Sequence, residues 1–286
     1  MRALILRRYG DPDVLQVGET PDPVPGSGEV LVDLRVSGVN PIDLGVRAGN
    51  VLPDSPDRFP MVLGWDGAGI VEALGPEVAN LAIGDRVMVM SKQPSSGVGL
   101  HADMAAVTSD FVIRLPDRVS FEHAAAAPLA SITALNAVEA LDLVPGQTVH
   151  VNNPVGAVGR AARQIARHLG LRVSDAPAPG TADGAIDVRG GIAAQDAFDA
   201  VADGGRYATV IPEWWKPGGP YTAARGIEPI VIENAPTHSR LEQVVAYLAD
   251  GVLRPEIETT FPLEEGAKAH AMLEAPGPTG KLLLIH

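Results

Sequence analysis

The segment Thr148–Ser174 constrains the fold more than any other part of the chain. It begins with Thr148–Asn152, an apolar run of the kind that is buried in a parallel sheet. A turn containing glycine follows, and then apolar residues recur at helical spacing from Val158 to Leu169, until Gly170 ends the helix. Leu171–Ser174 begins a second strand. Strand, glycine turn, helix and strand in this order predict the opening of a dinucleotide-binding α/β unit.

The turn contains the residue types that a pyrophosphate requires. Gly156 allows the backbone to approach a phosphate, and Gly159 allows the helix to pack closely on the strand. The helix that starts at Ala157 and Val158 directs backbone amides at an anion. Asn153 replaces the first glycine of the usual pattern, and asparagine tolerates the left-handed conformation that such a turn needs. A structural turn that binds nothing is the alternative.

The connection after Ser174 is too short for a complete unit of this type. Only ten residues, Asp175–Gly184, precede the next predicted strand, Ala185–Val188, and Pro177 and Pro179 exclude a helix among them. One parallel crossover alone needs about a dozen residues. Ten extended residues span about 33 Å, enough to return along a strand of about 17 Å. We therefore predict a sheet that lacks its third strand and has the second strand as its edge.

The rest of the chain divides into a β-rich and a mixed part. Short apolar segments interrupted by Gly and Pro turns predict a barrel-like domain near the start: Ala3–Leu6, Val30–Val36, Ile70–Leu74 and Arg86–Met90. Further elements are predicted at Glu122–Leu141 (helix), Tyr207–Ile211, Pro229–Glu233, Ser239–Leu248 (helix) and Lys281–Ile285.

Charge and composition exclude several classes of partner. The net charge of −13 opposes binding to nucleic acid and to anionic membrane surfaces. The chain contains no cysteine, which excludes disulfides and thiolate metal ligands and fits a cytoplasmic protein. Its first residues lack the features of a signal peptide. We expect a cytoplasmic protein that acts on a small molecule.

Motifs along nearly the whole chain resemble the medium-chain dehydrogenase/reductase superfamily, specifically its zinc-free quinone-oxidoreductase branch. These motifs are Ser37–Asp43, Val62–Val71, Gly84–Val87, Ala127–Ala134, Phe261–Glu265 and Gly280–Leu282. The resemblance implies a GroES-like catalytic domain at 1–117 and 257–286, and a Rossmann cofactor domain at 118–256 that lacks the usual elements between Ser174 and Ala185. It also implies NADPH- or NADH-dependent reduction of a quinone or enone in the interdomain cleft, and a homodimer formed through Pro229–Glu233.

Residue types argue against a catalytic zinc. Zinc-dependent relatives have a cysteine at the position of Asn40 and a His-Glu pair at Trp65-Asp66. Neither asparagine nor tryptophan replaces a thiolate or imidazole ligand. The seven histidines are scattered without metal-ligand spacing. We therefore expect no zinc.

The candidate site residues follow from these motifs. Those expected to be catalytic are Asn40, Asp43, Arg47 and Asp66, and those expected to bind substrate are Trp65, Thr133 (at a helix start), Trp214 and Trp215. Those expected to bind cofactor are Asn153, Gly156, Ala157, Val158, Gly159, Asp175, Gly190 and Ile211, with Gly191 and Pro212 beside them. Asp175 stands where an acidic residue accepts hydrogen bonds from a ribose; an ordinary loop residue is the alternative.

Structural roles remain open for several of these residues. Asn40 and Asp43 are equally suited to capping a turn. Arg47 and Asp66 could instead form an ion pair. Gly190 and Gly191 could form a simple turn that binds nothing. One of the two adjacent tryptophans is expected to line the cleft, or else to pack in a core or dimer interface.

Two functions compete. The first is reduction of an enone or quinone by NADPH or NADH. The second is a non-redox cyclase, isomerase or lyase of polyketide-like natural-product biosynthesis that has lost the cofactor, which the short connection after Ser174 and Asn153-Pro154 in the turn motivate. A non-catalytic binding protein ranks below both, because polar residues such as Asn40 and Asp66 remain.

Overall fold

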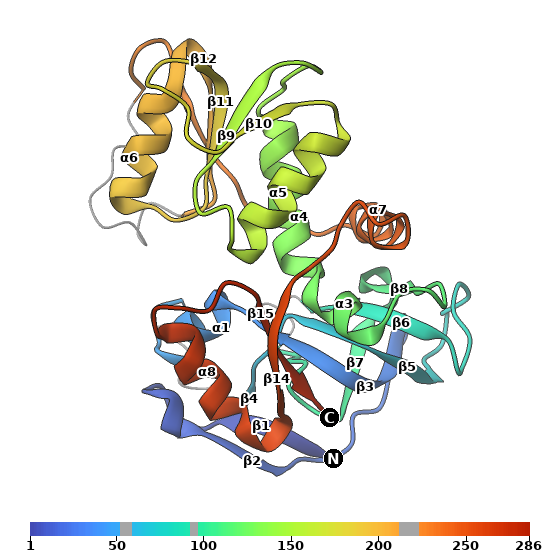
Figure 1. Ribbon diagram of the computed structural model, residues 1–286. Coiled ribbons are helices and arrows are strands. Elements are labelled where there is room, and N and C mark those ends of the chain that lie inside the picture. The colour runs from blue at the N-terminus through green and yellow to red at the C-terminus, as the bar shows by residue number, and fades with distance from the viewer. Residues whose placement is uncertain (52–58, 92–96, 212–222) are drawn as a thin grey trace. The chain divides into compact units, whose positions relative to one another are not determined.

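The computed structural model describes residues 1–51, 59–91, 97–211 and 223–286. The chain forms two compact units (Figure 1). Unit 1 comprises Met1–Leu129, Pro236–Asp250 and Pro255–His286, and unit 2 comprises Ala130–Ala235 and Gly251–Arg254. Pro212, Trp214 and Trp215 lie outside the described residues.

Unit 1 is built on two β-sheets. The smaller sheet has the order β2 (Leu15–Glu19), β1 (Arg2–Leu6), β4 (Met61–Val62), and its neighbours are antiparallel. The larger has the order β14 (Ile257–Pro262), β15 (Lys281–Ile285), β3 (Glu29–Val39), β5 (Asp66–Leu74), β6 (Arg86–Met90), β8 (Val112–Arg114), with β7 (Met104–Thr108) also paired to β3. Among the described residues of this unit, four α-helices accompany the sheets: α1 (Pro41–Arg47), α3 (Phe121–Ala126), α7 (His238–Ala249) and α8 (Gly266–Glu274).

Pairing between the two ends of the chain holds unit 1 together. The C-terminal strand β15 pairs antiparallel with β3, so that Leu282 lies opposite Val39. Leu282 and Leu284 are fully buried with Leu4 and Leu6 from the N-terminal strand. The last strand therefore completes the core that the first residues begin.

Unit 2 contains a five-stranded parallel sheet. Its order is β10 (Arg172–Ser174), β9 (Thr148–Val151), β11 (Ala182–Asp187), β12 (Val201–Thr209), β13 (Pro229–Val231). Its helices are α4 (Pro128–Ala140, whose first two residues belong to unit 1), α5 (Ala157–His168) and α6 (Gly191–Ala200). No strand lies beyond β10 among the residues that the structure describes. The prediction that the second strand becomes the edge is confirmed.

Some element boundaries differ from the prediction. The alanine-rich segment Glu122–Leu141 forms two helices, α3 and α4, which meet at Ala127 and Pro128. The break follows from the proline, which lacks the amide hydrogen that a continuous helix would use. Thr133 consequently lies inside α4, and its prediction at a helix start is wrong.

Strand boundaries in unit 2 also differ. β11 begins at Ala182 instead of Ala185, with an irregularity in register between Ala182 and Gly184. The chain connecting β10 to β11 is therefore shorter than the sequence suggested. No helix in the described ranges has the length and apolar character that crossing a bilayer needs.

Candidate functional site

The glycine turn of unit 2 has the tight geometry expected from its residues. Asn153 has φ of 51°, the left-handed conformation that its side chain tolerates. A Cβ on Gly159 would overlap the carbonyl oxygen of Asn153, so α5 packs directly on the turn. Gly159 therefore allows close packing of α5 on the turn that follows β9.

The start of α5 fits a phosphate group. Gly156 is the N-cap residue, and a Cβ there would lie 2.6 Å from the Asn153 amide nitrogen Nδ2. Ala157, Val158 and Gly159 are the first helical residues, whose amides have no carbonyl partner one turn earlier in the helix. An anion at this point therefore meets backbone N–H groups without an intervening side chain.

A buried polar network lies at the ends of β9, β11 and β12. Asn152 donates through Nδ2 to Asp187 Oδ1 (2.6 Å) and to the carbonyl oxygen of Ala193 (3.0 Å), and its Oδ1 accepts from Val188 N (2.8 Å). Thr209 Oγ1 donates to Asp187 Oδ2 (2.8 Å). Asn152, Asp187 and Thr209 are all buried. The network links the carboxyl ends of these three strands, and such folds bind ligands outside the carboxyl ends of their strands.

The same carboxylate shapes the turn before α6. Asp187 Oδ1 also accepts from Arg189 N (3.0 Å) and Gly190 N (2.9 Å). Gly190 has φ of 74° and Gly191 has φ of 60°, a conformation that favours glycine. A Cβ on Gly190 would lie 3.3 Å from a methyl carbon of Ile211. Two of the predicted cofactor residues, Gly190 and Ile211, are therefore neighbours.

A cavity of about 580 Å³ opens at this turn. Its lining residues are Arg189, Gly190, Gly191, Ile192, Ala193 and Asp196. Because this cavity lies at the start of α6, after the end of β11, it occupies the position where open α/β sheets receive ligands.

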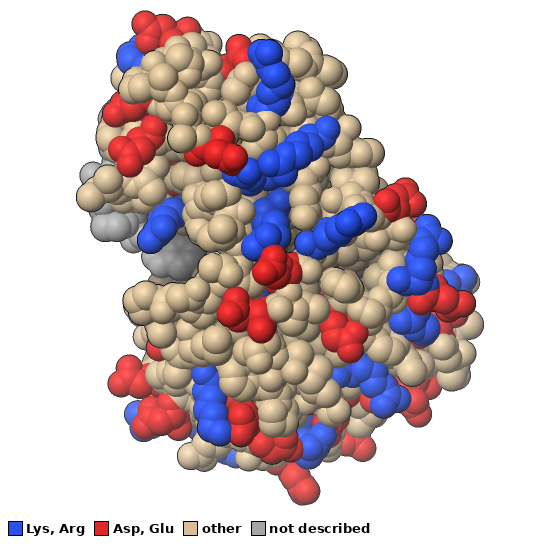
Figure 2. Space-filling view, viewed as in Figure 1, with Lys and Arg blue, Asp and Glu red and all other residues tan. Residues whose placement is uncertain are grey.

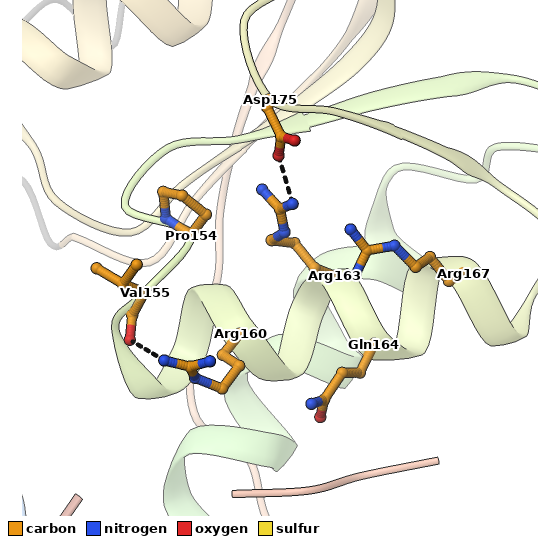
Figure 3. A pocket seen from close by; sticks show the side chains of 7 residues that line it. All are labelled: Pro154, Val155, Arg160, Arg163, Gln164, Arg167 and Asp175. Carbon is orange, nitrogen blue, oxygen red and sulfur yellow. Dashed lines mark hydrogen bonds and ion pairs between the residues drawn. The ribbon is translucent and has the colours of Figure 1, made fainter. Parts of the chain in front are cut away.

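Asp175 is engaged within the protein. Its Oδ1 forms an ion pair with Arg163 Nη2 from α5 (Figure 3). The carboxylate nevertheless remains largely exposed, with 74% of the side-chain surface accessible, while Arg163 retains 13%. Asp175 therefore keeps accessible surface with which to accept a hydrogen bond from a ligand.

In unit 1, four of the predicted polar positions belong to two separate buried clusters. The first, the lysine cluster, consists of Asn40, Asp43, Asp66 and Lys281, which are all at most 4% exposed. Lys281 Nζ lies 2.9 Å from Asp66 Oδ2 and also donates to Asn40 Oδ1. Asn40 Nδ2 donates to Asp66 Oδ2 (3.0 Å), and the amide of Leu129 donates to Asp66 Oδ1 (2.9 Å).

A glycine makes room for the lysine. A Cβ on Gly38 would lie 2.9 Å from Lys281 Cε and 2.6 Å from the carbonyl oxygen of Ala125. A larger residue at position 38 would displace the lysine side chain from its carboxylate. The lysine cluster thus depends on the close approach of β3, β15 and α3.

Asp43 connects α1 to the lysine cluster. Its Oδ2 accepts from the amide of Asn40 (2.8 Å), which caps the start of α1, and its Oδ1 accepts from Gly64 N (3.0 Å). Burial raises the pKa of Asp43 to about 7, and the nearby Asp66 carboxylate adds to the rise. The two amide hydrogen bonds and the Lys281 ammonium oppose it. The capping role that the sequence left open for Asp43 is therefore present.

Arg47 belongs to the second cluster. Its guanidinium forms an ion pair with Glu274 of α8, donates to the carbonyl oxygen of Gly10 (3.1 Å) and lies 3.4 Å from His270 Nδ1. The suggested ion pair between Arg47 and Asp66 is wrong, because each has its own partner of opposite charge. The sequence could not distinguish these pairings, since α8 and β15 come more than two hundred residues later.

Neutral imidazoles accompany these charges. His101 Nε2 lies 3.3 Å from the carbonyl oxygen of Gly38, and burial lowers the pKa of His101 to about 4. Burial also lowers the pKa of His270 well below its ordinary value. Both rings are therefore uncharged at neutral pH. Within the described ranges, His, Cys, Asp and Glu form no group of three or more that could hold a metal ion.

The predicted substrate residues are found in different places. Trp65 lies in unit 1, and its indole nitrogen is buried without a hydrogen-bond acceptor among the described residues. Thr133 lies in unit 2, where its hydroxyl accepts from Asn234 Nδ2 (2.8 Å).

Sequence reasoning missed four residues of these networks as site residues: Asn152, Asp187, Thr209 and Lys281. A signal existed for two of them, Lys281 and Asp187. Lys281 opens an otherwise apolar strand, and Asp187 interrupts the apolar run Ala185–Val188. A charged residue at a position whose neighbours are buried requires a partner. The identity of that partner is what the sequence does not reveal.

Comparisons with known proteins agree with this architecture. Residues 26–117 match the family described as alcohol dehydrogenase GroES-like domain, and residues 161–284 match the family described as zinc-binding dehydrogenase. The chain is 28% identical to the quinone oxidoreductase of Sus scrofa over 332 aligned positions, covering 100% of this chain and 98% of that protein. Because this chain has 286 residues, that relative carries residues with no counterpart here.

Solved structures give the same result. The quinone oxidoreductase from Coxiella burnetii superposes with a TM-score of 0.87 at 25% identity, covering 100% of this chain and 99% of that one. An NAD-dependent alcohol dehydrogenase superposes with a TM-score of 0.87 at 29% identity over 100% of both chains. Together with the GroES-like segment and the parallel sheet, these similarities confirm the resemblance: the chain belongs to the medium-chain dehydrogenase/reductase superfamily and is a quinone-oxidoreductase-like member with a shortened Rossmann unit.

Proposed function

We propose that this protein is a zinc-independent reductase that uses NADPH or NADH to reduce a quinone or an enone. The observation that carries the proposal is the turn between β9 and α5, where Asn153 is left-handed and Gly156 and Gly159 leave the backbone open to a pyrophosphate. The similarity of the chain to quinone oxidoreductases along its whole length supports the same reaction class.

The residues of unit 2 would hold the cofactor from its phosphates outward. The amides of Ala157 and Val158 would bind the pyrophosphate. Asp175, after β10, would accept a hydrogen bond from the adenosine ribose. Gly190 and Ile211 would contact the nicotinamide end, because they lie after the strands β11 and β12 beside the cavity at α6. The bound cofactor would supply a hydride.

The lysine cluster would position groups and not react itself. Both amide hydrogens of Asn40 are donated within the protein, to Asp66 and, at 3.4 Å, to the carbonyl oxygen of Gly38. Both oxygens of Asp43 accept backbone amides. We therefore assign Asn40, Asp43 and Asp66 to fixing α1 and the neighbouring strands, and Arg47 to fixing α8.

Trp65 is the residue of unit 1 that we assign to the substrate. Its indole N–H has no acceptor among the described residues, and a buried donor without an acceptor is costly. A carbonyl oxygen of a quinone or enone would provide that acceptor and would gain a hydrogen bond as negative charge develops on it. The apolar ring would contact the rest of the substrate.

Cofactor titration tests the proposal directly. Purified protein is titrated with NADH and NADPH by calorimetry, and cofactor oxidation is then followed with a small quinone and with an enone. We expect saturable binding of at least one cofactor and oxidation that depends on the added acceptor. Absence of binding by both cofactors would contradict the reductase and favour the non-redox cyclase, isomerase or lyase, for which the short β10–β11 connection is the motivating observation.

A further inference from the structure

A pocket of about 360 Å³ runs along one side of α5 in unit 2. Its lining residues are Pro154, Val155, Arg160, Arg163, Gln164, Arg167 and Asp175 (Figure 3). Pro154 and Val155 belong to the glycine turn, so the pocket begins beside the phosphate-binding backbone and extends along the helix.

The pocket concentrates positive charge in an acidic protein. Three arginines and one aspartate line it, which leaves a net charge of +2, whereas the whole chain carries −13. Figure 2 shows Lys and Arg side chains gathered over the part of unit 2 that α5 occupies in Figure 1. Arg163 and Arg167 are four positions apart on the helix, a spacing at which like charges destabilise it. The arrangement is therefore unfavourable for the helix alone.

The three arginines differ in how they are engaged. Arg160 Nη2 donates to the carbonyl oxygen of Val155 (3.3 Å), which holds it on the turn. Arg163 is paired with Asp175, and in Figure 3 its guanidinium and that of Arg167 extend from the same side of the helix. Arg167 is exposed and forms no ion pair with any residue in the described ranges.

Arg163 has an unmet donor. Its side chain is 13% exposed, and Nη1 is buried with no hydrogen-bond acceptor in the part of the chain that the structure describes. A buried guanidinium nitrogen without an acceptor loses hydration and gains nothing in return. An anion in the pocket would accept from Arg163 and Arg167 together.

The short connection after β10 explains why this side of α5 is open. α5 packs on β9 and β10, and β10 is the edge of the sheet. Residues 175–181 join β10 directly to β11 without a helix. A crossover helix after β10, which a longer chain would need to reach a third strand, would lie on this side of the sheet beside α5. Its absence leaves the arginines accessible.

We propose that the pocket along α5 binds a phosphate monoester. The planar guanidinium fork matches phosphate oxygens with two parallel hydrogen bonds, and a phosphate dianion balances the net charge of +2. Two sources supply this chemistry. One is the 2′-phosphate of NADPH, an assignment that rests on the proposed function and would give preference for NADPH over NADH. The other is a phosphate group on a separate small molecule.

Binding of small phosphate probes to the full chain tests this site. The probes are inorganic phosphate and adenosine 2′-monophosphate, with adenosine as the probe that lacks the charge. The variants are Arg167→Gln, which disturbs no ion pair of the described residues, and Asp175→Asn, which removes the one carboxylate of the pocket. The matched control is Arg206→Gln, an exposed arginine on β12 that lies 3.8 Å from Asp142.

The two variants are expected to act in opposite directions. Arg167→Gln should weaken adenosine 2′-monophosphate roughly tenfold, because a charge-assisted hydrogen bond is lost. Asp175→Asn should strengthen the same binding, because a negative charge is removed and Arg163 is released. Arg206→Gln should leave it unchanged. Absence of binding by both phosphate probes, or binding that neither pocket variant alters, would overturn the proposal.

Parallel titrations with NADPH and NADH identify the source of the phosphate. If Arg167→Gln weakens NADPH but not NADH, the phosphate is that of the cofactor. If both cofactors are unaffected while the phosphate probes depend on Arg167, the site receives a separate phosphorylated molecule. NADH lacks the 2′-phosphate, so its turnover with a quinone tests the proposed function independently of this pocket.

Discussion

Lys281 and Asp66 form a buried ion pair, with 2.9 Å between Nζ and Oδ2, although 215 residues separate them in the sequence. The lysine is 4% exposed and the aspartate is fully buried. Asn40 bonds to both, so the three side chains together link β15 to β5 and to the start of α1. Removing two charges from water offsets much of their attraction. We infer that the pair contributes more to the correct arrangement of these strands than to net stability.

Lys281→Met tests this pair. Removal of the ammonium leaves the Asp66 carboxylate buried without its counter-charge, so we expect the free energy of unfolding to fall by about 3–5 kcal/mol. Urea denaturation measures the loss. The double variant Lys281→Met/Asp66→Asn should recover part of it, because no unpaired charge remains. If Lys281→Met is as stable as the wild type, the Asp66 carboxylate does not need the Lys281 ammonium as its counter-charge, and this interpretation is wrong.

The raised pKa of Asp43 predicts that the free energy of unfolding depends on pH. Because burial raises its pKa from 3.8 to about 7, the folded protein holds a proton between these values that the unfolded chain releases. Stability from this group therefore falls as the pH rises from about 4 to 7, by a few kcal/mol in total. Urea denaturation at several pH values measures the slope.

Asp43→Asn is the comparison for that measurement. The amide does not titrate, so the variant should lack the decline while retaining the opposite contribution of His101. The pKa of His101 is lowered to about 4, so its contribution to stability is present above its ordinary value of 6.5 and is lost as the pH falls toward 4. Identical pH profiles for Asp43→Asn and wild type would refute the raised pKa.

Gly159→Ala should impair the glycine turn. The added Cβ would overlap the carbonyl oxygen of Asn153, so α5 must move away from the turn. We expect a loss of about 1–3 kcal/mol in unfolding free energy and a weaker binding of NADH. Gly26→Ala is the control, since its Cβ would meet only the end of the flexible Glu29 side chain, at 3.2 Å. Unchanged NADH affinity in Gly159→Ala would count against cofactor binding at this turn.

Trp65→Phe separates a substrate role from packing. Phenylalanine keeps an aromatic ring but lacks the indole N–H, which has no acceptor among the described residues. We expect the unfolding free energy to change by less than about 1 kcal/mol. In contrast, kcat/KM with a quinone should fall roughly tenfold, since one hydrogen bond to the substrate is lost. If kcat/KM of this variant equals that of the wild type, Trp65 has a structural role and does not bind the substrate through its indole N–H.

The unit 2 sheet shows which features of the fold can be predicted from short segments of the sequence. The run Thr148–Asn152, the helical spacing after it and the ten residues following Ser174 were enough to predict a parallel sheet that ends at β10. Chain length decides this outcome, because a crossover cannot be shorter than the strand it returns along. The start of β11 was displaced by three residues, because Ala182, Asp183 and Gly184 have no strong strand propensity and join the sheet through pairing with β9 and β12.

The candidate site was less predictable because its contacts are distant in sequence. Asn40, Asp43 and Asp66 were identified from the motifs that resemble the family, and Lys281 was noticed only as a member of another such motif. Arg47 was paired with the wrong carboxylate for the same reason: its partner, Glu274, lies on a helix near the other end of the chain.

The sequence by itself determined the strand, glycine turn and helix that open unit 2, the conformation of that turn and the loss of a third parallel strand. These features depend on residues that are close along the chain, whose backbone preferences and connection lengths act locally. Only the tertiary structure decided which charges meet: Lys281 with Asp66, Arg47 with Glu274, and Arg163 with Asp175. Charge partners are chosen by the packing of whole elements, and that packing is set by the burial of apolar surface and not by the charged residues themselves.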